Sequence, residues 1–126
     1  MIVFIAEDDP PSLLFLSDWL KAEGYSVVTA SHGEEVVRLI EETPPDLVLL
    51  DIMLPGMSGT ELLPAIKQRH PKVPVVMVTA LWDAPERKRA FELGASDYVT
   101  KPLDLDYLRF VVHSALKGGA SKERSP

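Results

Sequence analysis

The stretch that decides the fold is Leu47-Val48-Leu49-Leu50-Asp51, four consecutive apolar residues followed directly by a carboxylate. Continuous apolarity predicts a strand that is buried on both faces, as in the centre of a parallel sheet. Four further short apolar runs are spaced along the chain, and most are rich in β-branched residues or lie between turn signals. They are residues 2–6, 25–30, 73–80 and 98–99. The five runs together predict five strands.

Amphipathic stretches alternate with these runs, so a strand-helix unit repeats along the chain. Each stretch carries apolar side chains at helical spacing. The sets are Phe15, Leu16, Trp19 and Leu20; Val36, Val37 and Ile40; Leu62, Leu63 and Ile66; Ala90, Phe91 and Leu93; and Leu105, Leu108, Val112 and Ala115. Asp104 is the expected N-cap of the last helix. Right-handed crossovers then place helices on both faces of one parallel sheet, which is a doubly wound α/β fold of the (βα)5 type.

Length and composition narrow the function classes. The chain has 126 residues, the size of one domain, with 13 Lys+Arg against 19 Asp+Glu and no cysteine. The net charge of −6 argues against nucleic-acid binding by this chain, and the run Arg87-Lys88-Arg89 is interpreted as a solvated helix face. The absence of cysteine excludes a disulfide scaffold, a thiolate zinc site and a cysteine nucleophile. No apolar run approaches the ~20 residues that span a bilayer, and the start of the chain does not read as a signal peptide.

Polar residues follow the predicted strands at the edge where an open α/β sheet binds its ligands. They are Glu7, Asp8 and Asp9 after the first strand, Asp51 after the third, Thr79 near the end of the fourth and Lys101 after the fifth. Two carboxylates about 4 Å apart repel by roughly 4 kcal/mol at an effective dielectric constant near 20, so clustered acids need a proton or a cation. Oxygen ligands with few carboxylates suit Mg²⁺, and a lysine opposite would attract an anion beside the metal.

Four motifs, in this order and at these separations, resemble the receiver domain of two-component response regulators. They are Phe4-Ile5-Ala6-Glu7-Asp8-Asp9-Pro10, residues 45–59 around Leu50-Asp51-Ile52-Met53-Leu54-Pro55-Gly56, Val78-Thr79-Ala80, and residues 94–102 ending in Tyr98-Val99-Thr100-Lys101-Pro102. The likeness covers residues 2–117 and implies a flavodoxin-like, five-stranded parallel sheet of order 2-1-3-4-5. We expect a receiver domain over residues 1–117 and a flexible tail or the start of a linker over residues 118–126.

The resemblance implies that Asp51 is a phosphoacceptor for the phosphohistidine of a sensor histidine kinase or histidine phosphotransfer protein, or for a small phosphodonor. A carboxylate can attack phosphorus to form an acyl phosphate. Thr79 and Lys101 are expected to contact phosphoryl oxygens, because the transferring group is anionic. The alternative for Asp51 is a side chain that only caps the following turn. The Lys101-Pro102 bond is expected to be cis.

The same resemblance implies a magnesium site. Asp8 and Asp51 are expected to bind Mg²⁺ directly, Glu7 through water and Met53 through its backbone carbonyl. Asp9 is assigned to the start of the first helix because two prolines follow it. The alternative, in which Asp8 and Asp9 form the metal pair, is disfavoured.

Tyr98 matches the switch aromatic of the family. Phosphorylation is expected to draw Thr79 toward the phosphoryl group, and Tyr98 then moves from an outward rotamer into the space left behind. The changed surface is that of the fourth helix, fifth strand and fifth helix, and it allows a phosphorylation-dependent homodimer. The alternative for Tyr98 is a strand residue with its hydroxyl at the rim.

Two departures from the family pattern lead to further expectations. Leu13 and Leu14 stand where polar residues are more usual, and we expect them to form an apolar patch on which the phosphohistidine partner docks. Met53 and Leu81 lie two residues beyond Asp51 and Thr79. Both are apolar and cannot position an attacking water, which predicts a long-lived phosphoryl group.

Three rival functions are weaker. A magnesium-dependent phosphatase with an aspartyl-phosphate intermediate would need a second acid where Met53 stands. A domain that only binds proteins would not need the set Asp8, Asp51, Thr79 and Lys101. Flavin or dinucleotide binding lacks a Gly-x-Gly-x-x-Gly motif, and the three histidines are too scattered to predict a metal site. We therefore expect a cytoplasmic signalling domain that catalyses only its own phosphorylation and dephosphorylation.

Overall fold

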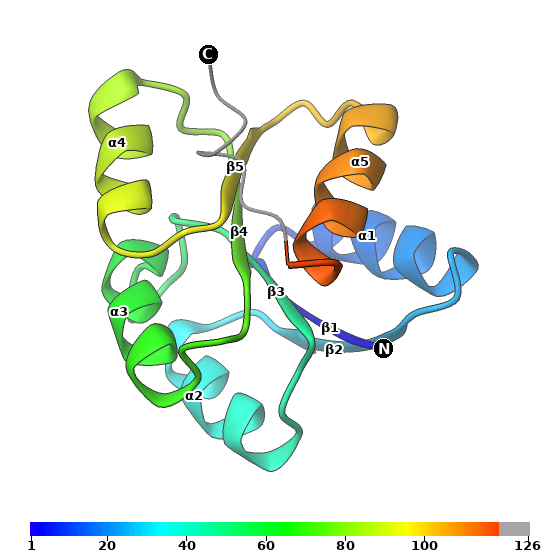
Figure 1. Cartoon of the computed structure of the whole chain (residues 1–126), viewed down its shortest axis with the longest axis horizontal. Coiled ribbons are helices and arrows are strands. Elements are labelled where there is room, and N and C mark those ends of the chain that lie inside the picture. The colour runs from blue at the N-terminus through cyan, green and yellow to red at the C-terminus, as the bar shows by residue number, and fades with distance from the viewer. Residues whose placement is uncertain (119–126) are drawn as a thin grey trace.

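In the computed structural model, which describes residues 1–118, five strands alternate with five helices (Figure 1). The strands are β1 (Ile2–Ala6), β2 (Ser26–Ala30), β3 (Leu47–Leu50), β4 (Val75–Thr79) and β5 (Asp97–Thr100), and the helices are α1 (Pro10–Ala22), α2 (Gly33–Glu42), α3 (Gly59–Arg69), α4 (Ala84–Glu92) and α5 (Leu105–Leu116). The predicted (βα)5 order is confirmed. The ladder of β4 begins two residues later than expected because Pro74 has no N–H to donate. Apart from Gly118, the predicted tail lies outside the described residues.

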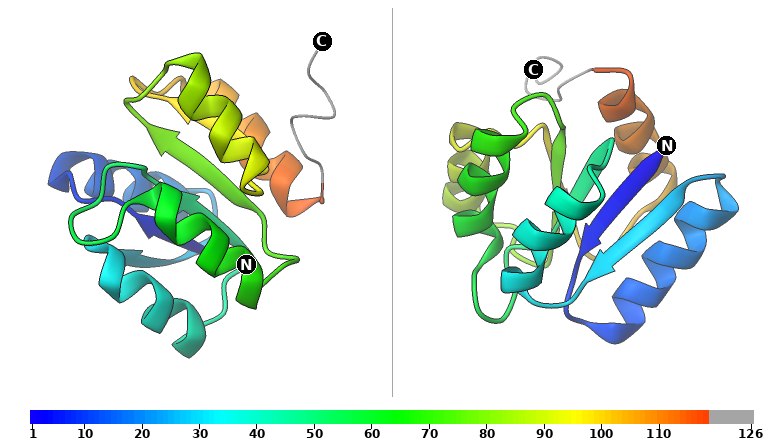
Figure 2. Two further views of the ribbon diagram at one scale, coloured as in Figure 1. Left: turned by 90° about the vertical axis from the view of Figure 1, so that its left-hand side faces the viewer. Right: turned by 90° about the horizontal axis from the view of Figure 1, so that it is seen from below.

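All strand neighbours are parallel, in the order β2-β1-β3-β4-β5, which confirms the predicted topology. Helices α1 and α5 cover one face, while α2, α3 and α4 cover the other (Figure 1 and Figure 2). In register, Ala6 stands opposite both Ala30 and Leu50, and Thr79 stands opposite Thr100. The carboxyl ends of the strands therefore meet at one edge of the sheet.

Each face of the sheet carries its own apolar core. Side chains of Val3, Ile5, Leu47 and Leu49 pack with α1 and α5, and their neighbours Phe4, Ala6, Val48 and Leu50 pack with α2 and α3. All four residues of β3 are buried, as continuous apolarity predicted. Complete burial of one such side chain is worth about 1.5–3 kcal/mol, so the apolar side chains of β3 stabilise the part of the sheet from which the site extends.

For one residue of α1, the prediction of a position in the core is wrong. Phe15 was placed on the buried stripe of α1, but 48 % of it is exposed. The stripe that faces the sheet is instead Leu16, Ser17 and Leu20, and Phe15 lies on the flank of the helix toward Leu103. Adjacent positions on a helix differ by about 100° in direction, so the neighbours of an apolar stripe can point along the surface.

Two acidic side chains cap the helices that follow the loops of the site. Asp9 caps α1 by accepting hydrogen bonds from the N–H and the hydroxyl of Ser12, and this hydrogen bonding lowers the pKa of Asp9. Asp104 caps α5, as predicted, by accepting from the backbone of Asp106 and Tyr107. Of the three acids that follow β1, Asp9 therefore has a capping role, which distinguishes it from Glu7 and Asp8.

Candidate functional site

Three carboxylates meet where β1 and β3 end. Glu7 and Asp8 follow β1, Asp51 follows β3, and one oxygen of each lies within 4.8 Å of the others. The backbone continues the sheet pairing past the strands, since Asp51 N donates to Ala6 O at 3.0 Å. Glu7 and Asp51 are buried, with 2 % and 5 % exposed, whereas Asp8 is exposed. The structure therefore brings together the acids that the sequence placed at this edge.

Lys101 reaches into this cluster from the loop after β5. Its ammonium forms ion pairs with Glu7 and with Asp51 Oδ2, the latter at 3.2 Å. The backbone N–H of Lys101 donates to Thr79 O at 2.8 Å, and the Lys101-Pro102 peptide bond is cis, as expected. One ammonium cannot balance three carboxylates, so the site keeps an excess of negative charge.

Burial and neighbouring charges shift the pKa values of Glu7, which is buried, and of Lys101, which is half-buried. Burial raises the pKa of Glu7, and the hydrogen bond from Lys101 offsets this only in part, while the charge of Asp51 acts in the same direction as burial. Burial by itself would lower the pKa of Lys101, but the hydrogen bond to Glu7 and the charges of Asp51 and Glu7 outweigh it, and the pKa is raised. Lys101 is thus a permanent positive charge at neutral pH.

Asp51 is held in one orientation by the turn that follows it. Its Oδ1 accepts a hydrogen bond from Met53 N at 3.0 Å, so the turn contact of the alternative interpretation is present, while Oδ2 faces Lys101. Gly59 lets α3 approach, because a Cβ there would lie 2.2 Å from Asp51 O. The second oxygen of the carboxylate remains directed at the charged cluster.

Thr79 ends β4, between the strand ends that carry Asp51 and Lys101. It is fully buried, and its Oγ1 accepts a hydrogen bond from Leu81 N at 3.3 Å. In the order of the strands, the Thr79 hydroxyl therefore lies between Asp51 and Lys101, and its hydrogen bond with Leu81 N connects it to the β4–α4 loop.

Tyr98 does not have the expected outward rotamer. Only 1 % of it is exposed, and its hydroxyl donates to Leu81 O at 2.6 Å. The Arg87 guanidinium lies over the ring, 5.6 Å from its centroid. Burial, with the nearby charges of Glu86 and Asp83, raises the pKa of the Tyr98 phenol to about 12. The Leu81 carbonyl and the Arg87 guanidinium therefore favour the inward position of Tyr98, and the sequence pattern revealed neither contact.

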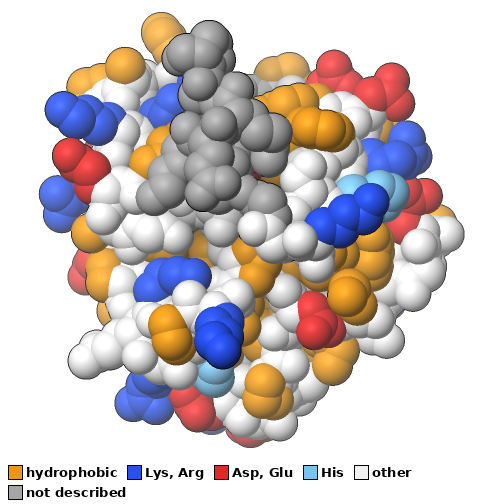
Figure 3. Space-filling view, in the orientation of Figure 1, with side chains coloured by type: hydrophobic (Ala, Val, Ile, Leu, Met, Phe, Trp, Pro, Cys, Tyr) orange, Lys and Arg blue, Asp and Glu red, His pale blue; other side chains and the backbone are white. Residues whose placement is uncertain are grey.

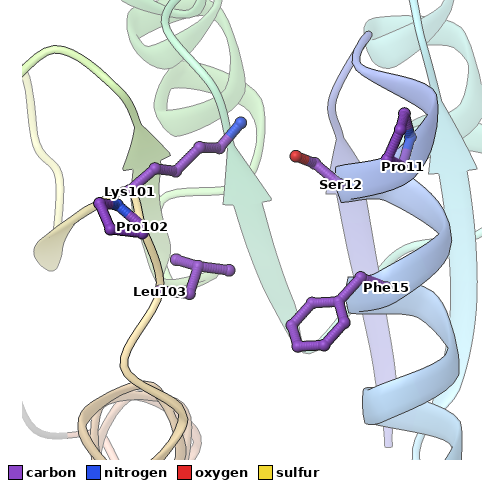
Figure 4. Close-up of a pocket in the computed structure, with 6 residues that line it drawn as sticks. All are labelled: Pro11, Ser12, Phe15, Lys101, Pro102 and Leu103. Carbon is purple, nitrogen blue, oxygen red and sulfur yellow. The ribbon is translucent and has the colours of Figure 1, made fainter.

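An apolar groove of about 460 Å³ opens beside the site, between α1 and the loop after β5. Its lining residues are Pro11, Ser12, Phe15, Lys101, Pro102 and Leu103 (Figure 4). Leu13 is half-buried against the core and Leu14 is exposed, and neither lines this groove. The apolar surface next to the site is therefore built around Phe15 rather than around the predicted pair.

Sequence reasoning missed two partners of the site, Phe15 and Arg87. Phe15 was assigned to the core but is exposed beside the groove. Arg87 is exposed, as predicted, but the sequence did not reveal its contact with the Tyr98 ring. The histidines are as scattered as expected: His32 lies beside Glu35, His70 beside Glu41, and His113 on α5. Within residues 1–118, the group of side chains able to hold a metal is the acid cluster. No helix in this range is long and apolar enough to cross a membrane.

Comparison with known families agrees with this site and fold. The model of the response regulator receiver domain matches residues 3–113. The chain therefore belongs to the response regulator receiver domain family. It is thus a phosphoacceptor signalling domain of two-component systems, whose members are phosphorylated by histidine kinases.

Curated relatives are longer than this chain. It is 43 % identical over 100 residues to the transcriptional regulatory protein BaeR of Escherichia coli, which covers 79 % of the chain and 41 % of BaeR. It is 40 % identical over 117 residues to a cyclic di-GMP phosphodiesterase of Thermotoga maritima, covering 93 % of the chain and 31 % of that protein. The chain thus spans less than half of either relative.

Solved structures show the same fold. The BeF3-activated receiver domain of Klebsiella pneumoniae RstA has a TM-score of 0.89 and 31 % identity, with 93 % of this chain and 99 % of that chain covered. A CheY-like receiver domain protein of Methanospirillum hungatei has a TM-score of 0.88 and 29 % identity, with 98 % of both chains covered.

Proposed function

We propose that this chain accepts a phosphoryl group on Asp51, in a Mg²⁺-dependent transfer from a phosphohistidine or a small phosphodonor. The observation that carries the proposal is the position of Asp51: buried at the end of β3, with one oxygen facing the Lys101 ammonium and two further carboxylates within 4.8 Å. A carboxylate that only capped a turn would need neither neighbour.

The transfer can be written with the residues of this site. The Asp51 oxygen that faces Lys101 forms a bond to phosphorus as the phosphorus–nitrogen bond of phosphohistidine breaks. The bonding electron pair stays on the leaving imidazole, which takes up a proton from solvent. Lys101 is freed from Asp51 to pair with a phosphoryl oxygen, and the Thr79 hydroxyl donates to another.

The residues present fit Mg²⁺, because hard oxygen ligands with excess negative charge are what this ion prefers. Asp8 and Asp51 would hold it directly, with the Met53 carbonyl as a third protein ligand. Both oxygens of Glu7 already have partners, Lys101 and the N–H of Asp9, which supports a contact through water. The capping bond between Asp9 and Ser12 supports Asp8 over Asp9 as the metal ligand. Bound Mg²⁺ would neutralise charge on the transferring group.

The groove beside Lys101 is the docking surface that we propose for the phosphohistidine partner. Phe15 is 48 % exposed on one wall and Leu103 forms the other, so an apolar side chain of the partner would be buried there. Phe15→Ala should slow transfer from the cognate kinase severalfold and leave labelling by acetyl phosphate unchanged. Leu14→Ala is the control, because Leu14 is exposed but lies outside the groove.

We further propose that the phosphorylated domain acts through the surface of α4, β5 and α5, including a homodimer, in the cytoplasm. The phosphoryl group should be long-lived, because Met53 is 56 % exposed beside the site and offers no group to position water. Loss of the label from the isolated domain within seconds would contradict this part.

Intact mass spectrometry tests the central proposal. Incubation with acetyl phosphate and Mg²⁺ should add one phosphoryl group to the wild-type chain and none to Asp51→Asn. Omission of Mg²⁺ should abolish the adduct. Repeated hydrolysis of phosphomonoesters would indicate a phosphatase instead, and the absence of any adduct would leave only a protein-binding domain.

A further inference from the structure

Tyr98 is enclosed by contacts from two segments that precede it in the chain. Its ring packs within the core on the α2, α3 and α4 side of the sheet, and 1 % of the residue is exposed. Its hydroxyl donates to Leu81 O at 2.6 Å in the β4–α4 loop. The Arg87 guanidinium of α4 covers the ring at 5.6 Å from the centroid.

Arg87 differs from its basic neighbours in this contact. Residues 87–89 of α4 are all exposed. Figure 3 shows several Lys and Arg side chains on the side of the molecule where α4 lies, with an acidic side chain among them. Within the described part of the chain, Arg87 is the member of this run that lies over an aromatic ring. A distance below about 6 Å to the centroid is the range in which a guanidinium is attracted to a tyrosine ring.

We propose that Arg87 is a clamp that holds Tyr98 inward before Asp51 is modified. This rests on the proposed function, in which the position of Tyr98 communicates the state of Asp51. The switch surface is then governed by α4 as well as by the phosphoryl group.

The clamp connects to the site through one peptide unit. The N–H of Leu81 donates to Thr79 Oγ1, and the carbonyl of Leu81 accepts from the Tyr98 hydroxyl. Outward movement of Tyr98 must break the hydrogen bond to Leu81, expose the ring and lose the Arg87 contact. Thr79, Leu81, Tyr98 and Arg87 therefore form a contiguous chain of contacts from the site to the surface of α4, and the two positions of Tyr98 are the two-state element through which they can be coupled.

The charges around Tyr98 support its role as a donor in this arrangement. Asp83 and Glu86 lie at the start of α4, and together with burial they favour the protonated phenol. The hydroxyl therefore keeps the proton that it donates to Leu81 O throughout the neutral range. The charge of Arg87 acts against this rise in the pKa of Tyr98, so what Arg87 contributes to the inward position is its cover over the ring.

Hydroxyl-radical footprinting of the full chain tests the clamp. Radical attack on tyrosine follows solvent exposure, and Tyr107, which is 43 % exposed, serves as an internal reference in the same digest. In the wild-type chain, oxidation of Tyr98 should be much slower than that of Tyr107. In Arg87→Met the rate at Tyr98 relative to Tyr107 should rise about two- to fivefold, the factor that corresponds to a contact at a partly exposed site.

Lys88→Met is the matched control, since it removes the same charge from the next position of the same helix, which is also exposed but points in another direction. It should leave the ratio unchanged, and Arg87→Lys should give an intermediate ratio. Equal protection of Tyr98 in wild type and Arg87→Met would refute the clamp, and so would the same rise in Lys88→Met. The footprint needs no phosphodonor, so failure of Asp51 phosphorylation would overturn the proposed function without affecting this measurement.

Discussion

Glu7 and Glu41 are both paired with basic side chains, yet their environments shift their pKa values in opposite directions. Glu7 lies at the end of β1, buried against Lys101, and its pKa is raised because burial outweighs the pairing. Glu41 lies on the exposed surface of α2, where hydrogen bonds from Arg69 and His70 lower its pKa. An ion pair by itself therefore does not determine the direction in which the pKa of a glutamate shifts. The extent of burial decides whether the charged form is favoured.

The two clusters also differ in charge balance. At the sheet edge one lysine faces three carboxylates, whereas on the α2–α3 surface two basic side chains face one carboxylate. An exposed pair that is fully compensated contributes little to stability. A buried cluster with excess charge is unfavourable until a cation joins it, which is expected of a binding site and not of a structural ion pair.

The largest effect should follow removal of the cation from the buried cluster. Lys101→Met leaves the buried carboxylates of Glu7 and Asp51 without their cation, and loss of one member of a buried ion pair costs about 3 kcal/mol in unfolding free energy. Urea unfolding in metal-free buffer measures this, with the exposed Lys72→Met as control. The variant should also fail to be labelled by acetyl phosphate. A loss equal to that of Lys72→Met would mean that the lysine is not paired in solution.

The second effect should have the opposite sign. Asp51→Asn removes one carboxylate from the cluster, and Lys101 keeps its contact with Glu7. Repulsion from two acids is relieved while one attraction is lost, so the metal-free chain should gain about 1 kcal/mol in unfolding free energy. Added Mg²⁺ should raise the melting temperature of the wild type and leave that of Asp51→Asn nearly unchanged. A lower melting temperature for Asp51→Asn without metal would contradict the picture of clustered acids.

The pH dependence should separate the two glutamates directly. The pKa of Glu41 is lowered, so its contribution to stability is present above the ordinary glutamate value and is lost as pH falls through the lowered pKa. The pKa of Glu7 is raised, so its contribution favours the folded chain at low pH and is lost as pH rises through the raised pKa. Carbon NMR titration of the two carboxyls in metal-free buffer should show midpoints on opposite sides of 4.5.

The sequence indicated the fold and the membership of this site because both depend on short-range patterns. The continuous apolarity of β3 requires a buried parallel strand, and the carboxyl ends of such strands meet at one edge, so Asp51 and Lys101 could be placed together. The strand order came from the resemblance to a family. The inward position of Tyr98 could not be predicted, because it depends on the Leu81 carbonyl and on Arg87, and no local pattern encodes those neighbours. The burial of Phe15 was predicted wrongly for a related reason. Helical spacing indicates which residues share a face of the helix, but not where the buried part of that face ends.

The smallest effect should come from the exposed cluster. Glu41→Gln removes the carboxylate that Arg69 and His70 share, but all three groups keep access to water, which replaces the lost contacts. The variant should unfold close to the wild-type midpoint at neutral pH and accept a phosphoryl group from acetyl phosphate at the wild-type rate. Glu7→Gln is the matched substitution in the buried cluster, because it replaces the same carboxylate by the same amide at a buried position. If the two variants shifted the unfolding midpoint equally, burial would not be what distinguishes a site from a surface ion pair in this chain.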